Sequence, residues 1–248
     1  MGKYDDVAVI ILAAGKGTRM KSEIAKVLHK VANKSMVVHV IESAAQIAPE
    51  NIHIVVGHQA QSVKDEILKY YHPNFVLQQT LQGTGDAVKT ALPHVNAKIN
   101  TVLVLCGDVP LIQPKTLGDL VDGHMINQSK VTVLATQVEN PTGYGRIVTG
   151  DDGRMLCIKE EADANEKEKH ICKVNTGIYC FDCNFLRSSI HEILPNNMQS
   201  EYYLTDLIEI ARKKEAKIVV VTMNDPDQVM GVNTLNELER AELLIQKR

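Results

Sequence analysis

The chain has 248 residues, of which 44% are hydrophobic and 23% are charged, a composition typical of a globular protein with one large or two small domains. Its formal net charge is −3, so we expect no nucleic-acid partner, and any anionic ligand must be held by local positive charge. No stretch approaches the roughly 20 consecutive apolar residues that span a bilayer, so we expect no membrane partner.

The first half of the chain alternates apolar and amphipathic runs, beginning with Val7–Ala14. This run follows Asp5 and Asp6 rather than the positive region of a signal peptide, so we interpret it as a buried strand of a cytoplasmic protein. Further apolar runs, which predict strands, cover Ile52–Val56, Phe75–Gln78, Thr101–Cys106 and Val131–Val138. Amphipathic runs between them predict helices over Met36–Ile47, Ala60–Tyr70, Thr84–Leu92 and Pro114–Met125. Apolar strands separated by helices imply an α/β fold with a mostly parallel central sheet flanked by helices.

After about Glu139 the pattern changes to a β-rich portion. Gly145–Glu161 predicts a β-hairpin whose turn contains Asp152 and Gly153. The remaining elements are predicted as strands over Val174–Phe181 and Ile218–Thr222 and helices over Asn184–Ile193, Glu201–Lys213 and Asn233–Lys247. We therefore expect one α/β domain with an inserted β-rich portion and a C-terminal helix.

The cysteines do not predict a disulfide framework, because their number is odd in a chain of this size. Cys180 and Cys183 form a CxxC pair, but no second pair or histidines at zinc-ligand spacing accompany it. We interpret the cysteines as structural or incidental.

A glycine-rich loop, "LAAGKGTRM", follows the first predicted strand. Gly15 and Gly17 let the backbone approach a ligand closely, and successive N–H groups can form a nest for an anion. Lys16, Arg19 and Lys26 add positive charge. Because ligands bind at the carboxyl ends of strands in open α/β sheets, the loop predicts a polyphosphate site. The alternative explanation is a glycine turn with solvated lysines.

Two well-known phosphate loops do not fit this stretch. A Walker A loop places its lysine after the last glycine, whereas Lys16 lies between two glycines. The dinucleotide-binding fingerprint requires a third glycine at the position of Met20. A P-loop kinase and a nicotinamide dehydrogenase are thereby disfavoured.

The loop and the following "KVLH" at Lys26–His29 together resemble the signature of sugar-1-phosphate nucleotidyltransferases. They are most similar to the N-terminal uridyltransferase domain of bacterial bifunctional N-acetylglucosamine-1-phosphate uridyltransferases. Ala25 departs from the proline that often precedes the lysine in that family. The resemblance implies a Rossmann-like nucleotidyltransferase fold.

Val76–Ala87 is similar to the uracil-recognition segment of this family. An alternative explanation for the segment is a polar loop whose Thr84 caps a helix. The resemblance implies that the nucleotide is bound by Leu12, Ala13, Ala14, Gly15, Gly17, Gln78, Gly83 and Thr84.

Val102–Ile112 places Asp108 directly after a predicted buried strand. Taken alone, Asp108 could be a turn residue, a helix cap or a Mg²⁺ ligand. The resemblance implies that Asp108 and Asn233, from "GVNT" near the end of the chain, together bind Mg²⁺. Only the family pattern pairs them.

Four further segments are similar to sugar-binding segments of the family, and they place Gly145, Glu160, Asn175, Tyr203 and Thr205 at its sugar contacts. The alternative explanations are a β-turn at Gly143–Gly145, a solvated acidic face at Glu160 and Glu161, and a helix start at Ser200–Asp206. We expect Glu161 and Asp163 to be surface charges.

The resemblance implies Mg²⁺-dependent transfer of a uridylyl group from UTP to N-acetylglucosamine 1-phosphate, a step toward cell-envelope precursors. Arg19, Lys26 and Lys16 would be the catalytic residues. Alternatives are a related nucleotidyltransferase for another sugar phosphate or base, and a sugar-nucleotide sensor without activity.

The domain organisation follows from the same resemblance. We expect residues 1–232 to form the nucleotidyltransferase domain and residues 233–248 to form a C-terminal linker helix. No segment of the chain resembles the family's acetyltransferase β-helix. We expect this chain to be monomeric, with a trimer as the alternative if a C-terminal domain is missing.

Overall fold

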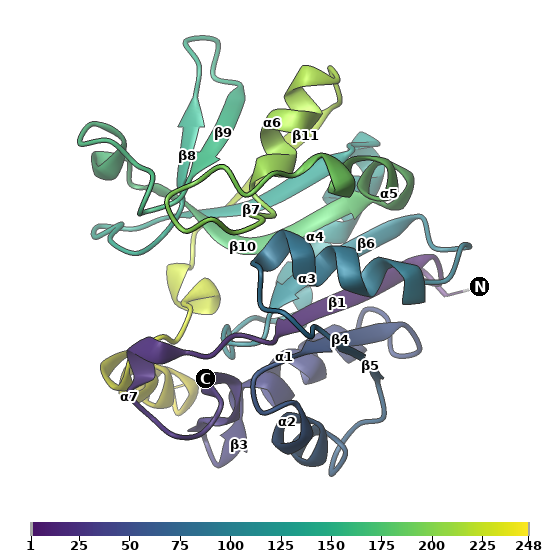
Figure 1. Ribbon diagram of the computed structural model, residues 1–248, viewed down its shortest axis with the longest axis vertical. Coiled ribbons are helices and arrows are strands. Elements are labelled where there is room, and N and C mark those ends of the chain that lie inside the picture. Colours follow the sequence, from purple (N-terminus) through teal and green to yellow (C-terminus); the bar gives the residue numbers. More distant parts are fainter. Residues whose placement is uncertain (1, 248) are drawn as a thin grey trace.

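The protein is described by a computed structural model covering residues 2–247, so the expected domain limits at residues 1 and 248 lie outside the described residues. A nine-stranded mixed sheet forms its centre, in the order β11-β7-β10-β6-β1-β4-β5, with β8 and β9 attached through β10 (Figure 1). The strands are β1 (Val7–Ala13), β4 (Ile52–Val56), β5 (Asn74–Leu77), β6 (Thr101–Cys106), β7 (Val131–Gln137), β8 (Arg146–Thr149), β9 (Met155–Lys159), β10 (Lys173–Asp182) and β11 (Ile218–Met223). A separate short hairpin consists of β2 (Lys30–Val31) and β3 (Lys34–Ser35).

The register of β1 determines where the site lies. β1 is parallel to both β4 and β6, and Leu12 lies opposite Val55 on one side and Cys106 on the other. β10 runs antiparallel to its neighbours β6 and β7, whereas β11 is parallel to β7. The predicted mostly parallel sheet is therefore confirmed. Because β1 and β6 end at the same edge, the glycine loop and the residues after Cys106 lie side by side.

The described residues contain seven α-helices. They are α1 (Met36–Ala45), α2 (Ala60–Ile67), α3 (Thr84–Ala91), α4 (Pro114–Asn127), α5 (Cys183–Ser189), α6 (Asp206–Lys213) and α7 (Leu235–Ile245). Of these, α1 to α6 cover the two faces of the sheet and α7 packs beside the β2–β3 hairpin. Alternate residues of β1 enter different cores, as expected for a strand buried on both faces: Ile10 belongs to the core cluster that contains residues of α3, α5 and α6, and Ile11 belongs to the cluster that contains residues of α1, α2 and α4.

The C-terminal helix returns to the N-terminal part of the chain. In Figure 1 the yellow α7 lies beside the purple segment that contains β3. A third core cluster joins Ala241 of α7 to Val31 and Leu111. Just before α7, Val232 N–H donates to the Asp108 carbonyl at 2.9 Å. This packing brings Asn233 to the end of β6.

One predicted helix begins later than the sequence indicates. Glu201–Lys213 was expected to be helical, but α6 begins only at Asp206. The preceding residues are held extended against the start of α3, because Tyr202 N–H donates to the Gln82 carbonyl and Gly85 N–H donates to the Tyr202 carbonyl, each at 2.7 Å. Similarly, α7 begins at Leu235, after the Thr234 cap, rather than at Asn233.

The other predicted elements are confirmed, with ends that differ by at most three residues, except that α5 ends at Ser189 rather than Ile193 and is followed by a 3₁₀ turn over Ile190–Glu192. The turn of the predicted hairpin is also confirmed, with Gly153 at φ +75°. All five cysteines are free. No helix among residues 2–247 is both long enough and apolar enough to cross a membrane.

Candidate functional site

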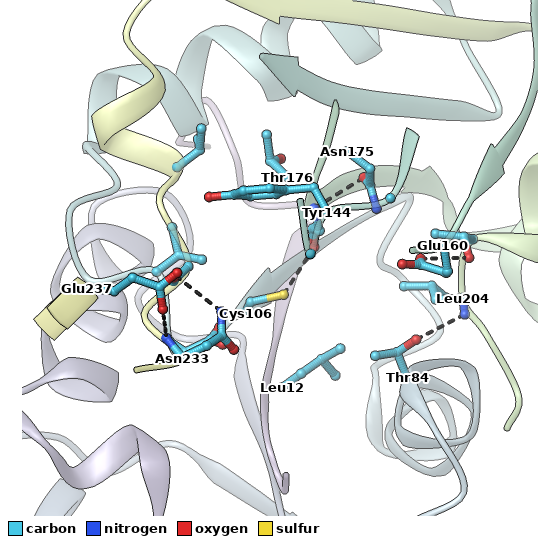
Figure 2. A pocket seen from close by; sticks show the side chains of 18 of the residues that line it. Leu12, Thr84, Cys106, Tyr144, Glu160, Asn175, Thr176, Leu204, Asn233 and Glu237 are labelled. Carbon is cyan, nitrogen blue, oxygen red and sulfur yellow. Dashed lines mark hydrogen bonds between the residues drawn. The ribbon is translucent and has the colours of Figure 1, made fainter. Parts of the chain in front are cut away.

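A cavity with two lobes lies at the carboxyl ends of β1 and β6. The loop lobe has a volume of about 540 Å³ and is lined by Ala13, Ala14, Gly15, Lys16, Gly17, Gln78 and Gly83, among others. The hairpin lobe, shown in Figure 2, has a volume of about 330 Å³ and is lined by Arg19, Gly145, Glu160, Asn175, Thr205 and Asn233, among others. The two lobes share Leu12, Lys26, Thr84, Cys106 and Asp108. They therefore form one continuous site with a common wall.

The glycine loop gives the loop lobe its backbone surface and its charges. β1 ends at Ala13, and Gly17 adopts the left-handed conformation, with φ +62°. A Cβ at Gly17 would overlap the side chain of Lys26, so glycine lets that lysine lie against the loop. Met20 is 1% exposed and anchors the following turn. Lys16 and Arg19 remain exposed on either side of Gly17.

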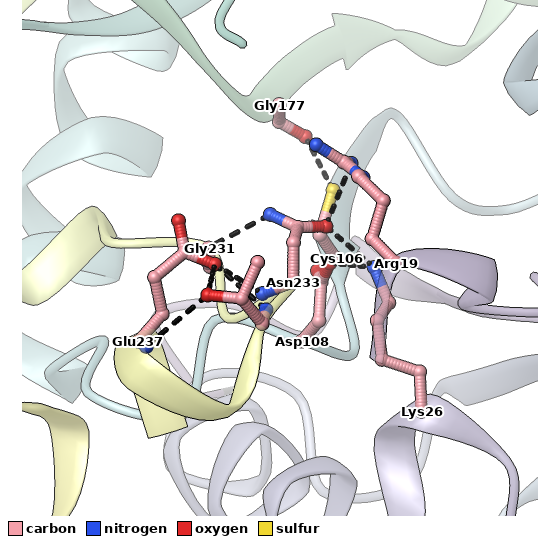
Figure 3. Close-up of polar contacts among 9 residues, drawn as sticks. Arg19, Lys26, Cys106, Asp108, Gly177, Gly231, Asn233 and Glu237 are labelled. Atoms are coloured by element: carbon pink, nitrogen blue, oxygen red, sulfur yellow. Dashed lines mark hydrogen bonds and ion pairs between the residues drawn. The ribbon is translucent and has the colours of Figure 1, made fainter. Parts of the chain in front are cut away.

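The common wall holds a cluster of opposite charges (Figure 3). The Lys26 ammonium forms an ion pair with the Asp108 carboxylate and donates to Asn233 Oδ1 at 3.1 Å. Arg19 Nη2 donates to the same Asn233 oxygen at 2.9 Å. The Lys26 and Asp108 side chains are only 17% and 16% exposed, so their interaction is partly shielded from water. The fold thus brings together two cationic side chains, Arg19 and Lys26, and two side chains whose oxygen atoms could bind a metal, Asp108 and Asn233.

These oxygen donors fit a magnesium ion. Carboxylate and amide oxygens are ligands that Mg²⁺ accepts, and one ammonium already reaches both, so Asp108 and Asn233 are close enough to serve one cation. Residues 2–247 contain no group of three or more His, Cys, Asp or Glu side chains placed to hold a metal. An ion at Asp108 would therefore complete its coordination with phosphate oxygens and water, as Mg²⁺ commonly does.

Glu237 fixes the position of Asn233. Its Oε2 accepts hydrogen bonds from the backbone N–H of Asn233 at 2.7 Å and of Thr234 at 2.8 Å. The Thr234 hydroxyl in turn accepts from Glu237 N–H, which completes a capping box at the start of α7. The sequence interpretation did not include Glu237, although its T-x-x-E spacing is the signal of this motif.

The hairpin lobe presents hydroxyl, amide and carboxyl groups. The Thr205 hydroxyl donates to Glu160 Oε1 at 3.3 Å, and burial raises the pKa of the Glu160 carboxyl. Asn175 donates through Nδ2 to the Tyr179 hydroxyl at 2.7 Å and through its backbone N–H to the Gly145 carbonyl at 2.8 Å. Such paired donors and acceptors are suited to the hydroxyl groups of a sugar.

Tyr203 is the one predicted site residue that lines neither lobe. It is 8% exposed, its hydroxyl donates to Gln199 at 2.8 Å, and it borders a separate depression beside Glu160. The alternative explanation, in which Thr84 caps a helix, does not hold. Gly83 occupies the N-cap position of α3, and the Thr84 hydroxyl accepts from Leu204 N–H at 3.1 Å.

Glu161 and Asp163, expected to be surface charges, are partly exposed, with 38% of the Glu161 side chain exposed, but each also has partners within the protein. Glu161 forms a 2.6 Å ion pair with Arg146, which is 1% exposed, and accepts from Gly143 N–H at 2.9 Å. These interactions lower the pKa of the Glu161 carboxyl, the backbone hydrogen bond contributing most. Asp163 is half-buried and accepts from Met198 N–H at 2.9 Å. Both carboxylates therefore hold loops near the hairpin lobe.

Cys106 and Tyr144 line the site without having been predicted. The Cys106 thiol donates to the Gly177 carbonyl at 3.4 Å, and burial raises its pKa to about 12, so it stays protonated and is a poor nucleophile. Tyr144 lies within the predicted turn at Gly143–Gly145, where its N–H donates to the Pro141 carbonyl at 3.1 Å. Neither residue stands out in the sequence, because a cysteine ending an apolar strand and a tyrosine in a turn are common.

Most of the chain is similar to known proteins. A family model described as nucleotidyl transferase matches residues 8–229. The chain is 43% identical over 243 residues to the bifunctional protein GlmU of Geobacter metallireducens, an alignment that covers 98% of this chain and 51% of that protein. It is 44% identical over 240 residues to the bifunctional protein GlmU of Clostridioides difficile, covering 96% and 51%. The chain thus spans about half the length of these curated relatives.

Two solved structures share the fold. A Bacillus anthracis protein named as a glucose-1-phosphate thymidylyltransferase aligns with a TM-score of 0.75 at 20% identity, over 98% of this chain and 96% of the other. The 4-diphosphocytidyl-2C-methyl-D-erythritol synthase of Anaerococcus prevotii aligns with a TM-score of 0.67 at 16% identity, over 97% and 98%. At such low identity these likenesses concern the fold alone, and they confirm the predicted Rossmann-like nucleotidyltransferase fold.

Proposed function

We propose, since the chain belongs to the nucleotidyl transferase family, that it transfers a uridylyl group from UTP to N-acetylglucosamine 1-phosphate in the presence of Mg²⁺. The products are UDP-N-acetylglucosamine, a precursor of the cell envelope, and pyrophosphate. The observation that supports this most directly is the meeting of the two lobes at Lys26 and Asp108. A nucleotide in the loop lobe and a sugar phosphate in the hairpin lobe would bring their phosphates together at this wall.

The reaction requires positioning and charge neutralisation more than proton transfer. The attacking oxygen of a sugar phosphate is already anionic, so no general base is needed. Lys26 holds the phosphates at the common wall, and Arg19 and Lys16 neutralise the departing pyrophosphate from the exposed side of the loop. Asp108 and Asn233 would hold Mg²⁺, which supplies further positive charge for the phosphates.

The two lobes divide substrate recognition between them. In the loop lobe, the backbone of Leu12, Ala13, Ala14, Gly15 and Gly17 faces the nucleotide, and Gln78, Gly83 and Thr84 complete its binding site. In the hairpin lobe, Gly145, Glu160, Asn175 and Thr205 bind the sugar. Tyr203 acts from behind this surface, by supporting the segment that carries Thr205.

The proposal also includes the limits of the domain, its cellular location and its oligomeric state. The domain responsible for the reaction comprises residues 1–232, and the following segment, which contains α7, is a linker. The protein works in the cytoplasm, and this chain alone is a monomer.

The test is pyrophosphate release with UTP, N-acetylglucosamine 1-phosphate and Mg²⁺, with each component omitted in turn. Release that requires all three is expected. Glucose 1-phosphate and CTP replace the natural substrates in parallel reactions, and a preference for either would reassign that substrate while leaving the reaction class intact. UTP binding without release under any condition would contradict the proposed activity and favour a sensor.

A further inference from the structure

Gln78 has its side-chain amide held in one orientation. The residue follows β5, is 4% exposed and lines the loop lobe. Its Nε2 donates to Asp86 Oδ2 at 2.7 Å and to the Gly83 carbonyl at 3.2 Å. A carbonyl oxygen and an ionised carboxylate can only accept hydrogen bonds, so both N–H groups of the amide are directed at them. The Oε1 atom is therefore the amide group left for a ligand.

The opposite amide orientation is disfavoured by the same contacts. Rotating the amide by half a turn would place Gln78 Oε1 against the Asp86 carboxylate and the Gly83 carbonyl. Two oxygen–oxygen contacts would replace two hydrogen bonds in a buried position, where an unpaired polar group is costly. Asp86 contributes the stronger of these constraints, because its bond to Gln78 is shorter and involves a charge.

Asp86 itself is well placed for this task. It lies in the first turn of α3, where the helix dipole favours a negative side chain. Asp86 is not among the described residues that line the loop lobe. It therefore acts through Gln78 and is a positioning residue.

We propose that Asp86 determines the nucleobase specificity of the loop lobe by orienting Gln78 as a hydrogen-bond acceptor. Uracil presents an imide N3–H donor, which Gln78 Oε1 accepts. Cytosine presents an unprotonated N3, which would face the same oxygen without a hydrogen. Thymine has the same imide as uracil, so the orientation of Gln78 distinguishes uracil from cytosine but does not distinguish uracil from thymine. The inference rests on the proposed function, because it assumes that a pyrimidine nucleotide occupies this lobe.

The test is the Asp86→Asn variant, whose amide can donate as well as accept and so permits both orientations of Gln78. kcat/KM is measured with UTP, 5-methyl-UTP and CTP at saturating N-acetylglucosamine 1-phosphate. The UTP-to-CTP ratio of kcat/KM should fall at least about tenfold, as expected when a buried hydrogen-bond preference is lost. The ratio of UTP to 5-methyl-UTP should not change.

A matched control is available on α2. Gln61 Nε2 donates to Asp65 Oδ1 at 2.8 Å, so the same pair of side chains occurs on an exposed helix face. Asp65→Asn should leave all three kcat/KM values unchanged. In Gln78→Ala, the further change Asp86→Asn should not alter the UTP-to-CTP ratio, because Asp86 then has no amide to orient.

The outcomes separate this inference from the proposed function. Wild-type protein that releases no pyrophosphate with UTP would contradict the proposed uridylyl transfer, whereas wild-type protein that uses CTP as well as UTP would overturn the inferred nucleobase specificity. Wild-type preference for UTP with an unchanged ratio in Asp86→Asn would overturn the role of Asp86 alone. An equal fall in kcat/KM with all three nucleotides would also overturn the role of Asp86 in specificity, since it would indicate a structural role. If Asp86→Asn does not fold, Asp86→Ala, which removes the acceptor without adding a donor, must still lower the ratio.

Discussion

At the scale of single residues, Lys26 connects the two halves of the site. Its ammonium contacts Asp108 after β6 and Asn233 before α7, and its aliphatic part lies against Gly17. The positive charge of the glycine loop is therefore directed at the common wall of the two lobes. This placement explains why a slightly acidic protein concentrates cations after its first strand.

Replacing Asp108 by alanine should abolish Mg²⁺-dependent turnover. The change removes the carboxylate of the proposed metal site and leaves the Lys26 ammonium without its ion pair. Initial rates measured across a wide range of Mg²⁺ concentrations test this, with Asp119→Ala, on the exposed face of α4, as the control. A variant that regains full activity at moderately higher Mg²⁺ would show that Asp108 is not a principal ligand.

Replacing Arg19 by alanine should lower kcat by about 10²–10³, the usual loss when one donor to transition-state charge is removed. Because Arg19 is exposed, the melting temperature should change little. Steady-state kinetics and thermal unfolding measure the two effects. Arg154→Ala, whose side chain is 87% exposed in the β8–β9 hairpin, is the matched control. Near-wild-type kcat in Arg19→Ala would exclude Arg19 from the chemistry.

At the scale of elements, the capping box of α7 links helix stability to the site. Glu237→Ala removes the acceptor for the N–H groups of Asn233 and Thr234. It should lower the free energy of unfolding by about 1 kcal/mol and also raise the Mg²⁺ concentration needed for half-maximal rate. Glu237→Gln keeps an acceptor oxygen and should restore part of both, whereas Glu239→Ala on the exposed face of α7 should affect neither. A loss of stability without a change in the Mg²⁺ requirement would limit Glu237 to capping.

The elements also show what sequence can and cannot predict here. Unbroken apolar runs such as Thr101–Cys106 identify strands buried on both faces, and their boundaries agree closely with the structure. Glu201–Thr205 was assigned to a helix because local pattern cannot reveal that Tyr202 pairs with the backbone near α3. The antiparallel direction of β10 likewise depends on partners distant in the chain.

The candidate site shows the same limit. The glycine loop is contiguous, so its glycines and cations, together with the strand before it, predict a phosphate site. The contact between Lys26 and Asn233 depends on the return of α7, and spacing does not encode it. Resemblance to a family paired Asn233 with Asp108, but it also placed Tyr203 among the sugar contacts, in a lobe that the residue does not line.

At the scale of the whole molecule, the buried His124 and the half-buried Asp206 give the free energy of unfolding opposite dependences on pH. His124 is 3% exposed, and burial lowers its pKa to about 4. Between pH 6.5 and 4 the unfolded chain therefore binds a proton at this histidine, whereas the native state does not. Its contribution to stability is therefore lost as the pH falls from about 6.5 to about 4. Burial, assisted by Glu209, raises the pKa of Asp206 to about 6 from 3.8. The native state then binds this proton more readily than the unfolded chain, so stability rises as the pH falls through about 6.

Because the two windows overlap, the contributions of His124 and Asp206 should partly cancel between pH 4 and 6. Asp206→Asn removes the gain on acidification, so its free energy of unfolding should fall more steeply with decreasing pH than that of the wild type. His124→Asn removes the loss and should give a shallower or reversed slope, the difference amounting to at most about 3 kcal/mol across the window. Urea unfolding at pH 4, 5, 6 and 7 measures these slopes. Parallel curves for all three proteins would mean that neither group titrates differently in the native and unfolded states.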